Sequence, residues 1–147
     1  MKLSLYLFLL IFISCTNNNS NFKPQTEADI IKYIKNKSLN ATKSSSGLYY
    51  VINNEGNGTR PKSTSNVTVA YKGYLLDGTV FDKSNDTGIS FGLNQVITGW
   101  TEGITYFKEG GEGVLLIPSN LGYGPNGIGS IPGGAALVFD IKLIRVN

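Results

Sequence analysis

Alternation of apolar and polar side chains with a period of two residues dominates the chain after Gly47. Between Val67 and Leu75 every second residue is apolar or glycine, which is the pattern of a strand with one buried face. The tight-turn signal Asp77-Gly78 follows, so residues 79–82 are expected to form the returning strand. The chain contains 18 glycines, mostly after residue 55, and this indicates many tight turns. A β-rich domain is therefore expected.

Three further segments have strand character: residues 48–52, 114–117 and 137–146. One helix is expected between the strands at residues 79–82 and 114–117, because Trp100, Ile104 and Phe107 are spaced i, i+4 and i+7. Thr98 is a plausible N-cap of this helix and Gly110 its end. The predicted fold class is α+β, with a twisted antiparallel β-sheet of about five strands wrapped on one short α-helix.

A second short helix is expected before the sheet, over residues 27–39. Thr26 followed by Asp29 resembles a capping box, with Asp where Glu or Gln is usual. The segment after it carries a one-sided apolar stripe, formed by Ile30, Ile31 and Ile34. Residues 26–46 are thus assigned to an N-terminal helix and a polar linker, and residues 47–147 to the main domain.

The first residues are typical of an export signal. Lys2 precedes an apolar run over residues 3–13, which is too short to span a bilayer, so residues 1–14 are predicted to be a signal peptide. Ser14-Cys15 resembles a bacterial lipobox, in which Cys15 is lipidated and anchors the protein at the membrane of the cell envelope, facing the periplasm. The alternative is an ordinary secreted protein. Residues 15–25 then form a polar tether.

Composition excludes several kinds of chemistry. The chain has no histidine and one cysteine, which rules out an internal disulfide and most zinc or thiol–imidazole catalysis, and neither a metal nor a cofactor is expected. The net charge of +3 is modest and no cluster of Lys and Arg is present, so nucleic-acid binding is not expected. Catalysis here would depend on apolar surface, hydroxyls, carboxylates and backbone groups.

Five motifs in this order resemble those of the FKBP-type peptidyl-prolyl isomerases, and the resemblance extends over about residues 47–147. They are YKGYLLDGTVFD at 71–82, FGLNQVITGWTEG at 91–103, IPSNLGYG at 117–124, IP at 131–132 and LVFD at 137–140.

The resemblance implies a pocket for a proline ring. Trp100 would form its floor; the expected walls are Tyr71, Phe81, Phe91, Val96, Ile97 and Phe139, with Ile131 at the rim. The backbone N–H of Ile97 and the hydroxyl of Tyr123 would each hold a ligand carbonyl, and Asp82 matches the single carboxylate of the pocket. Tyr71, Asp82, Tyr123 and Phe139 are the expected catalytic residues.

Each assignment has a simpler alternative. Phe81, Phe139 and Val96 would serve equally as core residues. Asp82 is also compatible with a solvated strand end, and Tyr123 with a loop residue that covers the core.

The resemblance implies an enzyme that catalyses rotation about X–Pro bonds in exported proteins, with Pro-containing polypeptides as partners and macrolides as expected inhibitors. A role in gliding motility is one hypothesis, because the architecture resembles that of gliding-associated lipoproteins of this family. One alternative is a non-catalytic tethered chaperone or assembly subunit that binds Pro-containing loops. Another is a carbohydrate-binding module, in which Tyr74 and Tyr106 stack on sugars.

Overall fold

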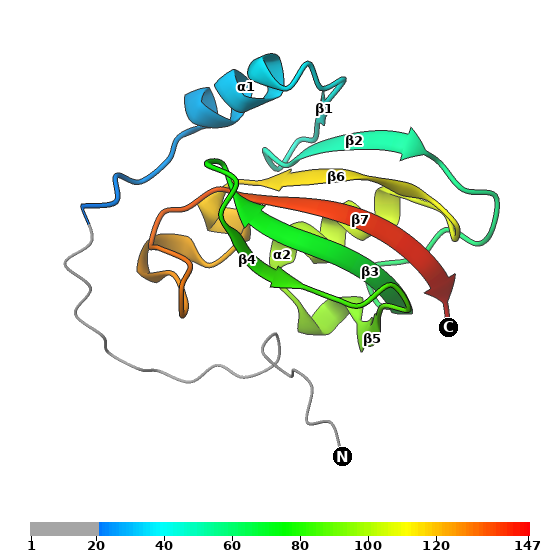
Figure 1. The fold of residues 1–147 in the computed structure, drawn as a ribbon. Helices are drawn as coiled ribbons and strands as arrows, with labels where there is room; N and C mark the ends of the chain where they lie inside the picture. Colours follow the sequence, from blue (N-terminus) through cyan, green and yellow to red (C-terminus); the bar gives the residue numbers. More distant parts are fainter. Residues whose placement is uncertain (1–20) are drawn as a thin grey trace.

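The computed structural model describes residues 21–147 (Figure 1). The predicted signal peptide and Cys15 lie outside the described residues. The regular elements are α1 (Glu27–Asn36), β1 (Thr42–Lys43), β2 (Tyr49–Asn54), β3 (Asn66–Leu75), β4 (Val80–Lys83), β5 (Ile89–Gly92), α2 (Thr98–Gly103), β6 (Glu112–Ile117) and β7 (Leu137–Val146), together with four 3₁₀ turns, η1 (Leu93–Gln95), η2 (Ile104–Tyr106), η3 (Ser119–Leu121) and η4 (Gly124–Asn126).

The strands form one antiparallel sheet in the order β1-β2-β6-β7-β3-β4, with β5 also paired to β3. The predicted α+β class, with an antiparallel sheet on a short helix, is confirmed. The sheet has seven strands instead of about five. The expected strands are all present, and the two that the sequence did not reveal are β1 and β5, which are two and four residues long.

The edge beside β3 is divided between two short strands. β4 pairs with the end of β3, through Lys72–Tyr74, and β5 pairs with its beginning, through Asn66–Val69. The alternation of β3 is borne out, since its apolar positions and Gly73 are buried and the residues between them are more exposed. This strand is therefore the element that joins both edge segments to β7 at the centre of the sheet.

The helix α2 packs on one face of the sheet, where the larger hydrophobic core lies (Figure 1). The predicted helical spacing is confirmed, because Trp100, Ile104 and Phe107 are all buried. The boundaries differ from the prediction: the helix already includes Thr98, and it continues as a 3₁₀ turn that ends at Tyr106. Thr98 is therefore not the N-cap.

Two glycines bring α2 close to β6. A Cβ on Gly99 would lie 2.5 Å from the side chain of Ile117, and one on Gly103 would lie 2.6 Å from Leu115. Because both distances are far below van der Waals contact, only glycine allows this approach. Close packing of α2 against the sheet fixes the height at which the Trp100 indole enters the core.

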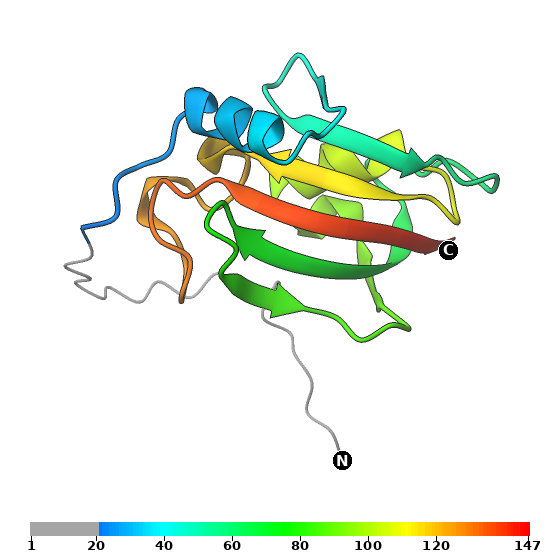
Figure 2. The same cartoon turned by 45° about the horizontal axis from the view of Figure 1, so that its top comes forward.

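The N-terminal helix α1 lies on the opposite face of the sheet (Figure 2). Its capping box is formed by the Thr26 N–H, which donates to the Asp29 carboxylate at 2.7 Å. Ile30 is buried against a second apolar cluster from β2, β6 and β7. Ile31 is 50% exposed, so its predicted place in the buried stripe is wrong. The helix is thus part of the same domain as the sheet.

The end of the predicted tether is packed against the domain. Phe22 contacts the main core, and Gln25 is hydrogen bonded to residues 134–136. The prediction of an unfolded segment up to Gln25 is therefore wrong for these last residues. Across residues 21–147, no helix combines the length and the apolar character needed to cross a membrane.

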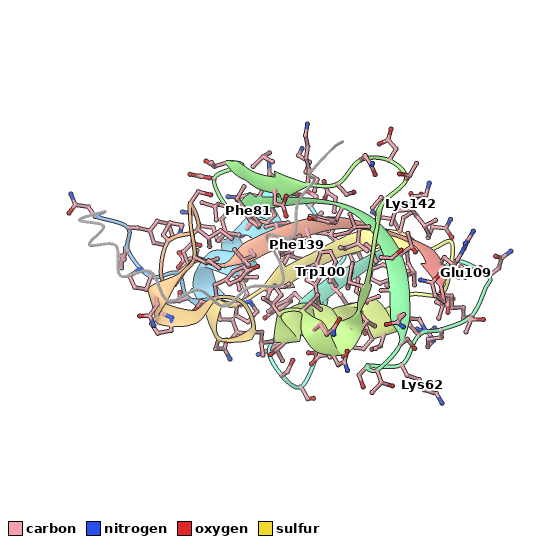
Figure 3. All side chains as sticks on the ribbon, turned by 90° about the horizontal axis from the view of Figure 1, so that it is seen from below. Lys62, Phe81, Trp100, Glu109, Phe139 and Lys142 are labelled. Carbon is pink, nitrogen blue, oxygen red and sulfur yellow. The ribbon has the colours of Figure 1, made fainter. Side chains whose placement is uncertain are left out.

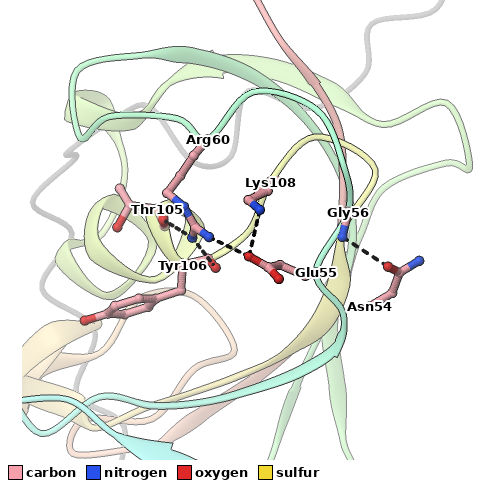
Figure 4. Close-up of polar contacts among 7 residues, drawn as sticks. All are labelled: Asn54, Glu55, Gly56, Arg60, Thr105, Tyr106 and Lys108. Atoms are coloured by element: carbon pink, nitrogen blue, oxygen red, sulfur yellow. Dashed lines mark hydrogen bonds and ion pairs between the residues drawn. The ribbon is translucent and has the colours of Figure 1, made fainter.

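A polar network ties the loop after β2 to the end of α2 and η2 (Figure 4). The Arg60 guanidinium donates to the carbonyls of Thr105 and Tyr106 at 3.1 and 2.6 Å, and it pairs with Glu55 at 2.9 Å. Lys108 Nζ lies 3.0 Å from the same carboxylate and lowers the pKa of Glu55. Arg60 thereby satisfies carbonyls that the helix end leaves without intrahelical donors.

Candidate active site

Aromatic side chains from three strands and α2 meet around Trp100, between the sheet and the helix (Figure 3). The indole makes edge contacts with Tyr71 and Phe139, each with ring centroids 5.1 Å apart, and a tilted contact with Phe91 at 5.4 Å. Phe81 contacts Phe139 edge-on at 5.5 Å. These geometries are the favourable ones for aromatic pairs.

The cluster is graded from a buried interior to a partly exposed border. Trp100 is 1% exposed, Phe139 is fully buried and Tyr71 is also buried. The side chains at the border are partly exposed and pack against this core: Phe81, Phe91, Val96, Ile97 and Tyr123. The expected rim residue Ile131 is itself buried, with 7% of its surface exposed. The structure thus brings all the pocket residues predicted from the sequence into one cluster.

A polar pair lies at the edge of the aromatic cluster. The Tyr71 hydroxyl donates to the Asp82 carboxylate at 2.6 Å. Burial is the main cause that raises the pKa of Tyr71, and the hydrogen bond to Asp82 adds to it, so the phenol stays protonated as a donor. Asp82 is therefore neither a free strand end nor a lone charge, because its orientation is fixed by this short charge-assisted bond.

A bulge explains how Phe81 and Asp82, which are consecutive, both reach the site. Consecutive residues of a regular strand point to opposite faces. Here Gly73 pairs with Asp82 and Tyr74 with Val80, which leaves Phe81 as an extra residue in β4. A bulge re-aims the side chains beside it. As a result the Phe81 ring contacts Phe139 while the Asp82 carboxylate accepts the Tyr71 hydroxyl.

Two residues that the sequence analysis did not assign to the site hold it in place. A Cβ on Gly73 would lie 2.7 Å from both the Phe81 and the Phe139 rings, so this glycine allows the two rings to meet. Ser84 holds the backbone of Tyr71, because its hydroxyl accepts from the Tyr71 N–H at 2.9 Å and its own N–H donates to the Tyr71 carbonyl at 2.9 Å. The signal for Gly73 was a glycine at an inward position of β3, but nothing in the sequence marked Ser84.

The segment from Val96 to α2 presents a backbone donor. The Ile97 carbonyl accepts the N–H groups of Trp100 and Thr101 at 2.9 and 3.1 Å, which fixes the start of the helix. Within residues 21–147, no group accepts a hydrogen bond from the Ile97 N–H. A ligand carbonyl bound by this N–H stays a prediction of the resemblance.

Tyr123 completes the border from the loop after β6. Burial raises the pKa of Tyr123 to about 12, and the negative charge of Asp82 contributes. Its hydroxyl therefore stays protonated throughout the neutral range. In the part of the chain that the structure describes, no three carboxylate, imidazole or thiol side chains are grouped as a metal site would require.

The site is distinct from the open depression on the other face of the sheet. That depression has a volume of about 450 Å³, and the residues that line it include the charged side chains of Lys72, Glu112, Asp140 and Lys142. Lys142 and Glu112 are ion paired at 3.1 Å. None of the aromatic rings that surround Trp100 lines it apart from Tyr71.

The sugar-stacking alternative finds little support in the structure. The Tyr106 ring is stacked on Tyr50 with centroids 4.1 Å apart and planes 9° apart, so this face is already covered. Tyr74 donates to Asp140 at 2.9 Å and is partly covered by Lys72.

Comparison with known proteins identifies the family. Residues 57–144 match the family described as FKBP-type peptidyl-prolyl cis-trans isomerase. The chain belongs to this family. The FKBP-type match includes every predicted catalytic and substrate-binding residue, from Tyr71 to Phe139, whereas the predicted lipidation site Cys15 lies outside it.

Curated FKBP-type relatives support the assignment. The chain is 50% identical over 105 residues to a probable FKBP-type peptidyl-prolyl cis-trans isomerase FkpA of Neisseria meningitidis, covering 69% of this chain and 39% of the relative. It is 44% identical over 118 residues to FkpA of Escherichia coli, covering 79% of this chain and 43% of the relative. The chain thus spans about two-fifths of the length of these relatives.

Solved structures share the fold. The crystal structure of FkpA from Escherichia coli superposes with a TM-score of 0.75 at 40% identity, over 82% of this chain and 58% of that one. A peptidyl-prolyl cis-trans isomerase from Pseudomonas syringae gives a TM-score of 0.73 at 32% identity, over 82% of this chain and 92% of that one.

Proposed function

We propose that this protein is a peptidyl-prolyl cis-trans isomerase that catalyses rotation about X–Pro bonds without a covalent intermediate. The observation that carries the proposal is the cluster of aromatic rings around Trp100 with the Tyr71–Asp82 pair at its edge, in a chain of the FKBP family. Apolar surface beside one ordered carboxylate suits a reaction in which no bond is made or broken.

The size of the barrier shows what the site has to supply. Rotation about the planar X–Pro bond is opposed by about 18–20 kcal/mol, and uncatalysed exchange takes tens to hundreds of seconds. The planar amide is more dipolar than the twisted one, so removal from water lowers the barrier. Desolvation of one amide is worth about 1–3 kcal/mol, or one to two decades in rate. The remainder must come from tighter binding of the twisted amide than of either planar isomer.

The aromatic cluster would bind the proline ring. The indole of Trp100 is only 1% exposed. A proline ring therefore reaches it only when partly exposed neighbouring side chains, such as those of Phe91 and Val96, move aside. We infer that these border side chains move, whereas Phe139 and Tyr71, which are buried, keep their positions. The rigid inner rings then set the shape to which the twisted amide is fitted.

The polar groups would hold the chain on either side of the rotating bond. The Ile97 N–H would bind a carbonyl on one side, and the Tyr123 hydroxyl would donate a second hydrogen bond. The carbonyl of the residue before proline would turn against Tyr71, Asp82 and Phe139. Since the Tyr71 proton is directed at the carboxylate, Tyr71 contributes mainly by keeping Asp82 in place.

For the cellular setting we propose a lipid-anchored protein of the cell envelope that faces the periplasm and acts on exported Pro-containing polypeptides. The support comes from the sequence alone: the export signal over residues 1–14 and the lipobox-like Ser14-Cys15. A contribution to gliding motility rests on the architecture that gliding-associated lipoproteins share. Macrolide binding is the expected inhibitory property of such a site.

A protease-free prolyl-peptide assay on the purified protein tests the activity. Phe139→Leu removes one ring from the site, and we expect kcat/KM to fall about tenfold or more. Phe107→Leu is the matched control. Phe107 is equally buried in the same core, but among the described residues it forms no aromatic pair with Trp100 or with the rings around it. The control variant should lower stability by a similar amount and leave kcat/KM near that of the parent.

Asp82→Ala should lower kcat/KM by about tenfold, which corresponds to ~1.4 kcal/mol. A parent protein that binds the peptide but does not accelerate its isomerisation would refute the enzyme and leave a non-catalytic binding protein. Equal activity of the parent, Phe139→Leu and Asp82→Ala would refute the proposed site.

A further inference from the structure

The segment before α1 is attached to the loop between β6 and β7, which carries Tyr123 and Ile131. The Gln25 N–H donates to the Gly134 carbonyl at 2.9 Å, and the Ala136 N–H donates to the Gln25 side-chain oxygen at 2.9 Å. Gln25 thus binds the chain on both sides of Ala135. Pro24 is packed directly on Gly134, because a Cβ added there would lie 2.7 Å from the Pro24 ring.

The attached loop has a closed base next to Tyr123. The Gly134 N–H donates to the Gly124 carbonyl at 2.9 Å, so the residue that receives the bond from Gln25 is itself bonded to the neighbour of Tyr123. The tip is closed by paired hydrogen bonds between Ile128 and Ile131, at 3.0 and 2.8 Å. The whole loop is therefore fixed internally.

Close contacts between backbone segments restrict movement within this loop. A Cβ on Gly133 would lie 2.0 Å from the Pro125 carbonyl oxygen, and one on Gly127 would lie 2.2 Å from that of Ile131. These two backbone contacts leave the loop little freedom to change shape between Gly124 and Gly134. A change at Gly134 is thus passed to Gly124 and Tyr123.

We propose that Gln25 is a positioning residue for the Tyr123 hydroxyl, so that the segment leading to α1 belongs to the catalytic unit. The inference rests on the proposed isomerase activity and on the role of Tyr123 in it. The Gln25 N–H and the Pro24 contact hold Gly134, and the Gln25 side chain holds Ala136 two residues further on. Gly134 in turn holds Gly124 beside Tyr123. The alternative is that the segment only adds stability to the fold.

A double-mutant cycle separates the two readings. Gln25→Ala removes the acceptor of the Ala136 N–H, and we expect kcat/KM to fall about three- to tenfold. In a Tyr123→Phe background, which lacks the hydroxyl to be positioned, the same change should have no further effect. The separate variant Gln25→Glu keeps a side-chain acceptor for the Ala136 N–H and should therefore retain most of the parent activity. Lys23→Ala, an exposed change in the same segment, is the control.

A second measurement does not depend on activity. Hydrogen exchange of residues 122–134 should become faster in Gln25→Ala and stay unchanged in Lys23→Ala. Equal losses of kcat/KM in the parent and Tyr123→Phe backgrounds would overturn the proposal, as would unchanged exchange in this loop. An inactive parent would count against the proposed function, and the exchange result would still decide the attachment of the loop by Gln25.

Discussion

Replacement of Gly73 by alanine tests whether the meeting of two phenylalanine rings creates the site. The new methyl group would lie 2.7 Å from ring atoms of both Phe81 and Phe139. Favourable carbon–carbon contacts lie at about 3.5–4.0 Å, so both contacts must lengthen by roughly 1 Å. Phe139 is fully buried, so we expect its contact with the new methyl group to be relieved mainly by a shift of the β3 backbone. Phe81 is partly exposed and is therefore the ring that we expect to be displaced.

The expected effect has two parts. Overpacking of this kind costs about 1–3 kcal/mol, and the lower half of that range applies because Phe81 is able to swing toward solvent. Displacement of a wall of the site should lower kcat/KM by about tenfold or more, because fit to the twisted amide is lost. Denaturant unfolding measures the first effect and a protease-free prolyl-peptide assay the second.

Gly78→Ala is the matched control for this experiment. Gly78 has φ +91° and a Cβ there would meet no atom within 4 Å, so alanine at this turn is destabilising through backbone strain alone. Both variants should lose stability, but only Gly73→Ala should lose activity. Combination with Phe81→Leu should recover part of the stability lost in Gly73→Ala. Parent-like kcat/KM in Gly73→Ala would refute the reasoning.

Three further predictions follow from the polar contacts. Tyr71→Phe removes the donor to Asp82, and we expect it to cost about 1.5 kcal/mol in denaturant unfolding and to reduce kcat/KM; full activity would contradict the positioning of Asp82. The pKa of Tyr123 is raised to about 12 in the folded protein, whereas unfolded tyrosine titrates near 10. The stabilisation that Tyr123 contributes should therefore be constant up to about pH 10, and the free energy of unfolding should fall as this contribution is lost between pH 10 and pH 12. Tyr123→Phe should make this fall shallower in a pH series of unfolding curves, and an unchanged slope would argue against burial as its cause. Arg60→Ala should lower stability by about 1 kcal/mol through its hydrogen bonds to two helix-end carbonyls, with kcat/KM unchanged. Lys108→Ala, which removes only an exposed ion pair, should have a smaller effect on the same unfolding curves.

Much of the fold could be predicted from local patterns, because burial imposes its period directly on the sequence. The alternation from Val67 to Leu75 predicted β3, and the spacing of Trp100, Ile104 and Phe107 predicted the buried side of α2. Short strands carry too few residues to show a period, so β1 and β5 were not recognised.

The details of the site depend on contacts between segments far apart in the chain. The bulge at Phe81 arises from register against β3, and no local pattern encodes it. Ser84 and Gly73 look like ordinary strand and turn residues until the pairing of β3 with its neighbours brings them beside Tyr71 and the two phenylalanines. Register and long-range pairing are therefore what the sequence left open.

The attachment of the N-terminal segment was also not predictable from composition. Asn, Ser and Pro around Gln25 are typical of a flexible tether. The two hydrogen bonds of Gln25 depend on a loop more than one hundred residues later in the chain. A polar composition therefore indicated low intrinsic order but could not reveal a partner supplied by the tertiary fold.

Trp100 is the only tryptophan in the chain, so tryptophan fluorescence reports on the residue that we propose as the floor of the site. Titration of the purified protein with a short Pro-containing peptide should give a saturable change in this emission, and the same peptide with alanine in place of proline should give none. Emission that ignores the Pro peptide, or that responds equally to both peptides, would contradict a proline ring seated on the indole.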